Sequence, residues 1–180
     1  MPTRYSPVQI MLHWTMAVVM IAAYLIGSQF EDMPRGPDKI SLIGWHALLG
    51  LSVLILLVPR VFLRRQGVPP LPPDMPVWQQ RLAHAVHVGL YAVMVLLPIA
   101  GLMALLAGRQ PMPVPFIGEI PVLFASPMLH EGAEEVHAFL GNVWLGLVIL
   151  HVAATVWHAF KKDGLATRMV PFGGTAIAKG

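Results

Sequence analysis

Four apolar stretches, each long enough to cross a lipid bilayer, constrain this chain more than any other feature. They cover about residues 8–28, 40–62, 82–107 and 136–160. A transmembrane helix needs about 20 mostly apolar residues, because the hydrocarbon core of a bilayer is about 30 Å thick. Only 12% of the residues are charged, against roughly a quarter in an ordinary soluble domain. The sequence therefore predicts an all-α, integral membrane four-helix bundle.

Two connectors between these spans are rich in proline, which lacks a backbone N–H and breaks helices. Residues 66–76 join the second span to the third, and residues 110–127 join the third to the fourth. No internal repeat is evident along the chain. We therefore expect a single domain over residues 1–180.

The distribution of lysine and arginine predicts the orientation in the membrane. Nine of the twelve lie at the N-terminus, in the second connector and in the C-terminal tail: Arg4, Arg60, Arg64, Arg65, Arg81, Lys161, Lys162, Arg168 and Lys179. The other three, Arg35, Lys39 and Arg109, lie in the first and third connectors. Because cytoplasmic loops carry the excess of lysine and arginine, we expect both termini to be cytoplasmic.

The absence of cysteine excludes several kinds of redox and metal site. Disulfides, iron–sulfur clusters, thiolate zinc sites and covalently attached haem all require cysteine. The net charge of +3 does not indicate nucleic-acid binding, because the basic residues cluster at span ends and no nucleic-acid motif is present. Eight histidines remain, which is many for so apolar a chain.

Two histidines on the fourth span have a spacing that suits two haems. His137 and His151 are 14 residues apart. In an α-helix this spacing brings them within about 40° of the same face and about 21 Å apart along the axis. An ionisable residue inside a span is costly and suggests a function, and histidine is a usual axial ligand of b-type haem. We therefore expect one haem near each membrane surface.

Partner histidines lie at matching depths. His46 is a few residues into the second span and level with His137, whereas His13 is in the same half of the bilayer as His151. Depth therefore predicts the pairs His46/His137 and His13/His151.

The partner of His151 remains open on depth alone. His84 and His87, near the start of the third span, compete with His13 for this role. His158, seven residues beyond His151 on the same face, competes as well.

Short motifs along essentially the whole chain resemble those of bacterial cytochrome b561. They are Arg4-Tyr-Ser-Pro-Val-Gln-Ile-Met-Leu-His-Trp14, Gly44-Trp-His46, Arg60-x-x-x-Arg64-Arg65, Leu82-Ala-His-x-x-His87, Val136-His137, Gly146-Leu-Val-Ile-Leu-His151 and Trp157-His158. No single motif is long, but their order and spacing are specific.

The resemblance implies a multi-pass cytochrome of the bacterial inner membrane that holds two haems b and is linked to quinone. The family's ligand pattern falls on His13, His46, His137 and His151, in agreement with the pairs drawn from depth. At least one member similar to this chain oxidises superoxide at the periplasmic face and reduces ubiquinone. The expected partners are therefore membrane lipid, quinone and superoxide.

A quinone site is expected near the cytoplasmic haem. Two axial histidines leave no open position on an iron, so proton-coupled chemistry must occur beside it. His158, with Trp157 next to it and Lys161 at the helix end, is the first candidate to bind a quinone carbonyl and supply a proton. His158 could equally be a histidine anchored at the membrane interface. His84 and His87 are weaker candidates for this role.

The arginines at the end of the second span have two possible partners. Arg60, Arg64 and Arg65 would pair either with haem propionates or, as the sequence favours, with lipid headgroups. His130, in an outer connector beside Glu131, is expected to be solvated.

The charge of the outer connectors opposes steering of an anionic donor. Residues 31–39 carry a net −1 and residues 109–135 a net −3, from Glu31, Asp32, Arg35, Asp38 and Lys39, and from Arg109, Glu119, Glu131, Glu134 and Glu135. Attraction of superoxide would require a positive potential. Two alternatives therefore stay open: an electron conduit for a partner hydrogenase or dehydrogenase subunit, and a non-redox transporter. Association with further copies of the chain is open too.

Overall fold

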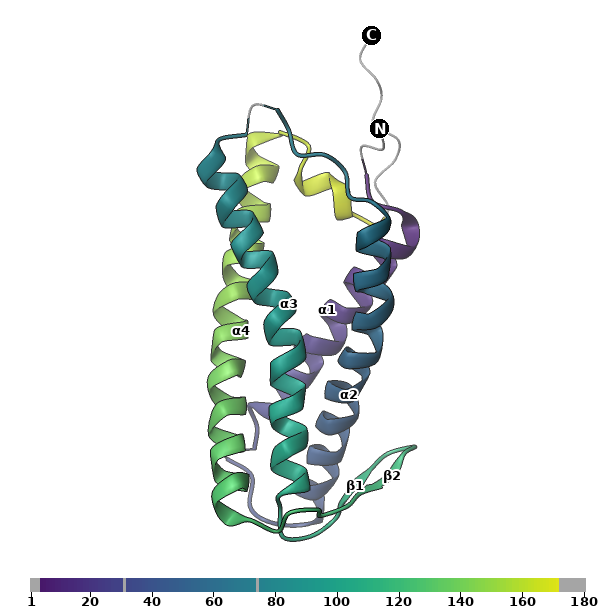
Figure 1. Ribbon diagram of the computed structural model, residues 1–180, viewed down its shortest axis with the longest axis vertical. Coiled ribbons are helices and arrows are strands. Elements are labelled where there is room, and N and C mark those ends of the chain that lie inside the picture. The colour runs from purple at the N-terminus through teal and green to yellow at the C-terminus, as the bar shows by residue number, and fades with distance from the viewer. Residues whose placement is uncertain (1–3, 31, 74, 172–180) are drawn as a thin grey trace.

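Four long helices form an elongated bundle in the computed structural model, which describes residues 4–30, 32–73 and 75–171 (Figure 1). They are α1 (Pro7–Gly27), α2 (Pro37–Gln66), α3 (Val77–Leu106) and α4 (Pro127–Lys161). All four are long and apolar enough to cross a membrane. The predicted all-α membrane four-helix bundle is confirmed. Of the charged residues counted above, Glu31 and Lys179 lie outside the described residues.

Local capping sets where the helices begin. Ser6 accepts a hydrogen bond from the amide of Gln9, and the Gln9 side chain accepts one from the amide of Ser6, which forms a capping box at α1. Ser126 caps α4, and Pro127 occupies its first turn. Helix α4 therefore begins nine residues before the apolar span expected from residue 136, and its first turns carry polar residues.

A short β-hairpin forms within the proline-rich connector between α3 and α4, whereas the predicted all-α fold contained no strands. Strands β1 (Met112–Val114) and β2 (Gly118–Ile120) pair antiparallel. The hairpin packs against α2 at Gly44, where a Cβ atom would overlap the carbonyl oxygen of Pro113. Glycine at this position therefore lets the hairpin lie directly on the helix.

The most extensive helix contacts lie within two sequential pairs, α1 with α2 and α3 with α4. Across the pairs, α2 packs on α3, and a buried cluster of Met16, Val53, Leu57 and Met94 joins α1, α2 and α3. Within the described residues, neither α1 nor α2 packs extensively on α4. Ring side chains of α4 contact rings of α1 and α2, as described below.

The bundle has two distinct ends. Helix α1 begins and helix α4 finishes at one end, which we call the terminal end, and the β-hairpin lies at the other, which we call the hairpin end (Figure 1). At the terminal end, the 3-10 helix η1 (Ala166–Met169) follows α4. Trp14 Nε1 donates to the carbonyl of Met169 at 2.7 Å, and Arg168 Nη1 donates to that of Pro70 at 2.7 Å. These bonds hold the segment after α4 against α1 and the α2–α3 connector.

Candidate functional site

Five ring side chains lie at seven-residue intervals along α4: His130, His137, Trp144, His151 and His158. Seven residues are about two helical turns and about 10.5 Å of rise, so these rings share one side of the helix. Trp144, at the centre, is buried and packs against Tyr24 of α1, with ring centroids 5.4 Å apart.

At the hairpin end, His46 of α2 faces His137 of α4, with ring centroids 5.6 Å apart. His46 Nδ1 lies 2.9 Å from the carbonyl oxygen of Ala23, and His137 Nδ1 lies 2.8 Å from that of Leu97. A carbonyl oxygen only accepts, so each Nδ1 must carry the hydrogen. In the neutral ring, Nε2 then keeps its lone pair, which is the form that binds a metal.

A glycine makes room for each of these two rings. Gly27 and Gly101 each lie four residues after the carbonyl that accepts the histidine hydrogen bond. A Cβ atom at Gly27 would lie 3.0 Å from His46 Cε1, and one at Gly101 would lie 2.9 Å from His137 Cε1. The same arrangement therefore occurs twice, with α1 seating the histidine of α2 and α3 seating the histidine of α4.

At the terminal end, three histidines gather rather than two. The ring of His151 lies 6.3 Å from that of His13 and 5.5 Å from that of His87, between centroids. His87 Nδ1 lies 2.6 Å from the carbonyl oxygen of Ala83, one turn earlier on α3. His84, the other candidate on α3, is exposed on the surface. Both His13 and His87 therefore remain within reach of His151.

Both clusters fit an iron held between two imidazoles. A ligating imidazole nitrogen lies about 2 Å from a first-row metal, and the ring centre about 1 Å further, which gives about 6 Å between centroids. The His46–His137 and His13–His151 separations of 5.6 and 6.3 Å are close to this value. At the hairpin end, the glycine-lined seats and the protonated Nδ1 atoms of His46 and His137 also supply the ligand form that a haem iron needs.

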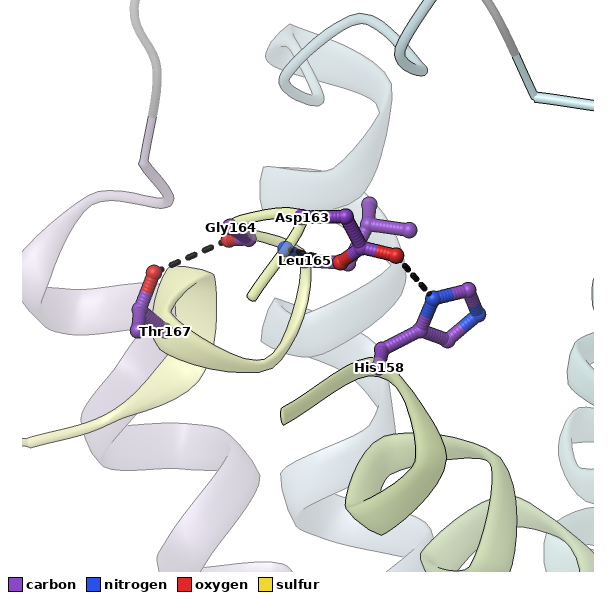
Figure 2. Close-up of polar contacts among 5 residues, drawn as sticks. All are labelled: His158, Asp163, Gly164, Leu165 and Thr167. Atoms are coloured by element: carbon purple, nitrogen blue, oxygen red, sulfur yellow. Dashed lines mark hydrogen bonds and ion pairs between the residues drawn. The ribbon is translucent and has the colours of Figure 1, made fainter. Parts of the chain in front are cut away.

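The residues expected at the quinone site do not form one cluster: His158 contacts Asp163, whereas Trp157 contacts Lys161. His158 Nδ1 lies 2.5 Å from a carboxylate oxygen of Asp163, and the other oxygen accepts from the amide of Leu165 at 3.1 Å (Figure 2). Trp157 and Lys161 contact each other, with Lys161 Nζ 5.5 Å from the indole centroid. His87 lies with His151 instead, as described above.

Asp163, just beyond the end of α4, is held in its charged form. Partial burial acts to raise its pKa, but the hydrogen bonds from His158 and from the Leu165 amide outweigh it and hold the pKa below the ordinary value of 3.8. At neutral pH, Asp163 is therefore a carboxylate that accepts the hydrogen bond from His158 Nδ1, so Nε2 is the His158 nitrogen that can contact another group.

Sequence reasoning missed three of these residues. His130 was expected to be solvated in a connector, but it lies on α4, where its Nδ1 is 2.8 Å from the carbonyl oxygen of Ala104 at the end of α3. The seven-residue spacing that links His137 to His151 also reaches His130 and Trp144, so that signal was available. Asp163 follows the last turn of α4 and carried no comparable signal.

A membrane-spanning bundle with paired intramembrane histidines defines the class of b-type membrane cytochromes. The sequence profile of a family described as prokaryotic cytochrome b561 matches residues 4–172, and the chain belongs to this family. It is thus a multi-pass electron-transfer protein of the bacterial inner membrane, and family membership implies haem b binding.

Three similar proteins cover nearly the whole chain. The chain is 28% identical to cytochrome b561 homolog 1 of Escherichia coli (strain K12), over 93% of this chain and 97% of that protein. It is 30% identical to the probable superoxide oxidase CybB of Yersinia pestis, over 95% of this chain and 98% of that protein. It is 25% identical to cytochrome b561 homolog 2 of Escherichia coli (strain K12), over 94% of this chain and 92% of that protein.

Proposed function

We propose that this chain holds two haems b and passes electrons from a donor at the hairpin end to a quinone at the terminal end. His46 and His137 would hold one iron, and His13 and His151 the other. The observation that carries this proposal is the pair of facing rings at each end of the bundle, 5.6 and 6.3 Å between centroids. Each bound haem would supply one-electron exchange between ferric and ferrous iron.

The protein residues fix the ligands and limit the chemistry. The bonds from His46 and His137 to backbone carbonyls orient the rings and make Nε2 a stronger ligand. Two imidazole ligands on each iron would leave no position for oxygen to bind directly. Between the two ends, the buried Trp144 packs against Tyr24.

Helix packing favours His13 over His87 as the partner of His151. A haem held between two histidines would need space between the helices that supply them. Helices α3 and α4, which carry His87 and His151, make the most extensive contact in the bundle. In the described part of the chain, α1 packs sparsely on α4, as α2 does around His46 and His137.

The proposed electron donor is superoxide and the proposed acceptor is ubiquinone. Two superoxide anions each lose one electron and leave as dioxygen, and one quinone takes up two electrons and two protons to become the quinol. His158 would take up a proton on Nε2 from the cytoplasm and pass it to the quinone, while Asp163 accepts the hydrogen bond from its Nδ1 (Figure 2). The name of the relative from Yersinia pestis, a probable superoxide oxidase, supports this donor.

The charge of the hairpin end favours a second candidate function. Its connectors carry a net negative charge, which repels superoxide. A conduit that receives electrons from a partner oxidoreductase subunit would have no such conflict.

Superoxide added to the purified protein with ubiquinone separates these functions. We expect haem reduction faster than spontaneous dismutation, with quinol as the product. In His158→Ala, haem reduction should persist while quinol formation falls about 10²-fold, the usual contribution of one general acid. The exposed His84→Ala variant is the control and should match the wild type. Haems that superoxide does not reduce would exclude it as the donor and favour the conduit.

A further inference from the structure

Arg60 is a cation in an unusual position. It lies on α2 at the terminal end and is only partly exposed. Its Nη2 is 3.0 Å from Nδ1 of His13. Its Nε is buried and has no hydrogen-bond partner among the residues that the structure describes. A buried donor without a partner is costly, so the guanidinium is incompletely satisfied in this arrangement.

Arg60 also lacks a counter-ion. Within residues 4–30, 32–73 and 75–171, the ion pairs are His130–Glu134 and His158–Asp163, so no carboxylate lies within 4 Å of Arg60. The nearest compensation is the ring of Tyr91, whose centroid is 5.9 Å from Arg60 and 5.4 Å from Arg64. Two cations sharing one ring repel each other. A partly buried guanidinium in this setting needs an anion.

The contact between Arg60 and His13 indicates that the anion is needed when His13 ligates an iron. A guanidinium only donates, so His13 Nδ1 must accept, and neutral His13 then carries its hydrogen on Nε2. That hydrogen blocks the nitrogen that would ligate an iron. His13 can therefore act as a ligand only when Arg60 bonds to another acceptor.

We propose that Arg60 binds a propionate carboxylate of the haem held at the terminal end. This inference rests on the proposed function. A haem b carries two such carboxylates, and a planar guanidinium matches a carboxylate with two parallel hydrogen bonds. The anion would satisfy Nε, neutralise the buried charge and release His13 Nδ1, so that one contact explains all three observations. The exposed Arg65 remains free to contact lipid headgroups.

The position of Arg60 also gives the two ends different electrostatics. Ferric iron carries one more positive charge than ferrous iron, so a nearby cation favours reduction of the ferric form. Arg60 and Arg64 lie around the terminal-end cluster. The terminal-end haem should therefore have the higher midpoint potential, which favours electron flow from the hairpin end.

Infrared redox-difference spectra of the haem-loaded protein test this assignment. The protein would be produced with haem labelled with ¹³C at the propionate carboxyl carbons, as wild type, Arg60→Lys, Arg60→Gln and Arg65→Gln. We expect the labelled carboxylate band to shift in both Arg60 variants and to stay unchanged in Arg65→Gln. Optical titration should show a lower midpoint potential for one haem in Arg60→Gln and a smaller decrease in Arg60→Lys.

The alternative anion is a lipid phosphate, and it predicts a different result. Identical propionate bands in all four proteins would overturn the proposal, and loss of co-purified phospholipid phosphorus in Arg60→Gln would then assign the site to lipid. If Arg60→Gln loses one haem altogether, a shifted band in the haem-replete Arg60→Lys variant still supports the proposal. A wild type with fewer than two haems would refute the proposed function rather than this contact alone.

Discussion

The two histidines proposed to hold a haem at the hairpin end each have one ring nitrogen held by a backbone carbonyl. Ala23 and Leu97 lie inside helices α1 and α3, and their carbonyl oxygens accept from His46 and His137. Because the acceptor is a backbone carbonyl, this hydrogen bond requires no second polar side chain in the membrane. It does require a small residue one turn later, because the ring lies over that position.

Replacing one of these glycines should dislodge its histidine. In Gly101→Ala, the new Cβ would lie 2.9 Å from two atoms of the His137 ring. We expect loss of about half of the haem and a destabilisation of about 1–3 kcal/mol from overpacking. Pyridine-haemochrome quantification of the purified protein measures the haem, and thermal unfolding measures the stability.

Gly146→Ala is the matched control on α4. No atom lies within 4 Å of a Cβ at Gly146, and alanine in a helix is up to about 1 kcal/mol more favourable than glycine. This variant should keep all its haem and be at least as stable as the wild type. Full haem content in Gly101→Ala would contradict the proposed seat of His137.

At this scale the sequence predicted the histidines but not their partners. Depth and spacing predicted that His46 would pair with His137, and the two rings do face each other. The accepting carbonyls could not be predicted, because every residue has one and only the helix packing selects it. The contact of Asp163 with His158 was not predicted for a related reason, because it depends on the conformation of the turn after α4.

Among the elements, the helices were predictable and the hairpin was not. Long apolar runs identify spanning helices by composition alone, because lipid offers the backbone no other partner. Strands β1 and β2 have three residues each, and their position depends on the packing of Pro113 on Gly44. The early start of α4 was missed because hydropathy marks the lipid-facing segment, whereas Ser126 and Pro127 set the helix boundary.

The packing of α1, α3 and α4 predicts which histidine variant loses a haem. If α1 supplies the second ligand at the terminal end, His13→Ala should retain one haem per chain, and His87→Ala should retain two. Haem quantification together with the α-band of the reduced spectrum measures this directly. The opposite result, with one haem in His87→Ala and two in His13→Ala, would assign the ligand to α3.

For the whole molecule, the orientation in the membrane is the main expectation still to be tested. Helix α1 begins and helix α4 finishes at the end of the bundle that carries Arg60 and Arg64 (Figure 1). The excess of lysine and arginine at this end predicts that it faces the cytoplasm. This orientation would direct electrons inward, from the periplasmic surface to a quinone that takes its protons from the cytoplasm.

Single cysteines can test the orientation, because the natural chain has none. Glu119→Cys places a thiol on the exposed hairpin, and Thr167→Cys places one on the exposed surface of η1. A membrane-impermeant maleimide should label the first in intact spheroplasts and the second only after lysis. The cysteine-free parent is the control, and the reverse labelling pattern would invert the orientation.

Because α4 packs sparsely on α1 and α2, the stability of the bundle should depend on bound haem. If each haem bridges these helices, the folded chain is stabilised by mass action, by about 2.7 kcal/mol when free haem is one hundred times its dissociation constant. In a cell that runs short of haem, α4 would then be joined to the bundle mainly through α3 and would be more exposed to membrane proteases. The abundance of this cytochrome would therefore follow the supply of its cofactor without any dedicated regulator.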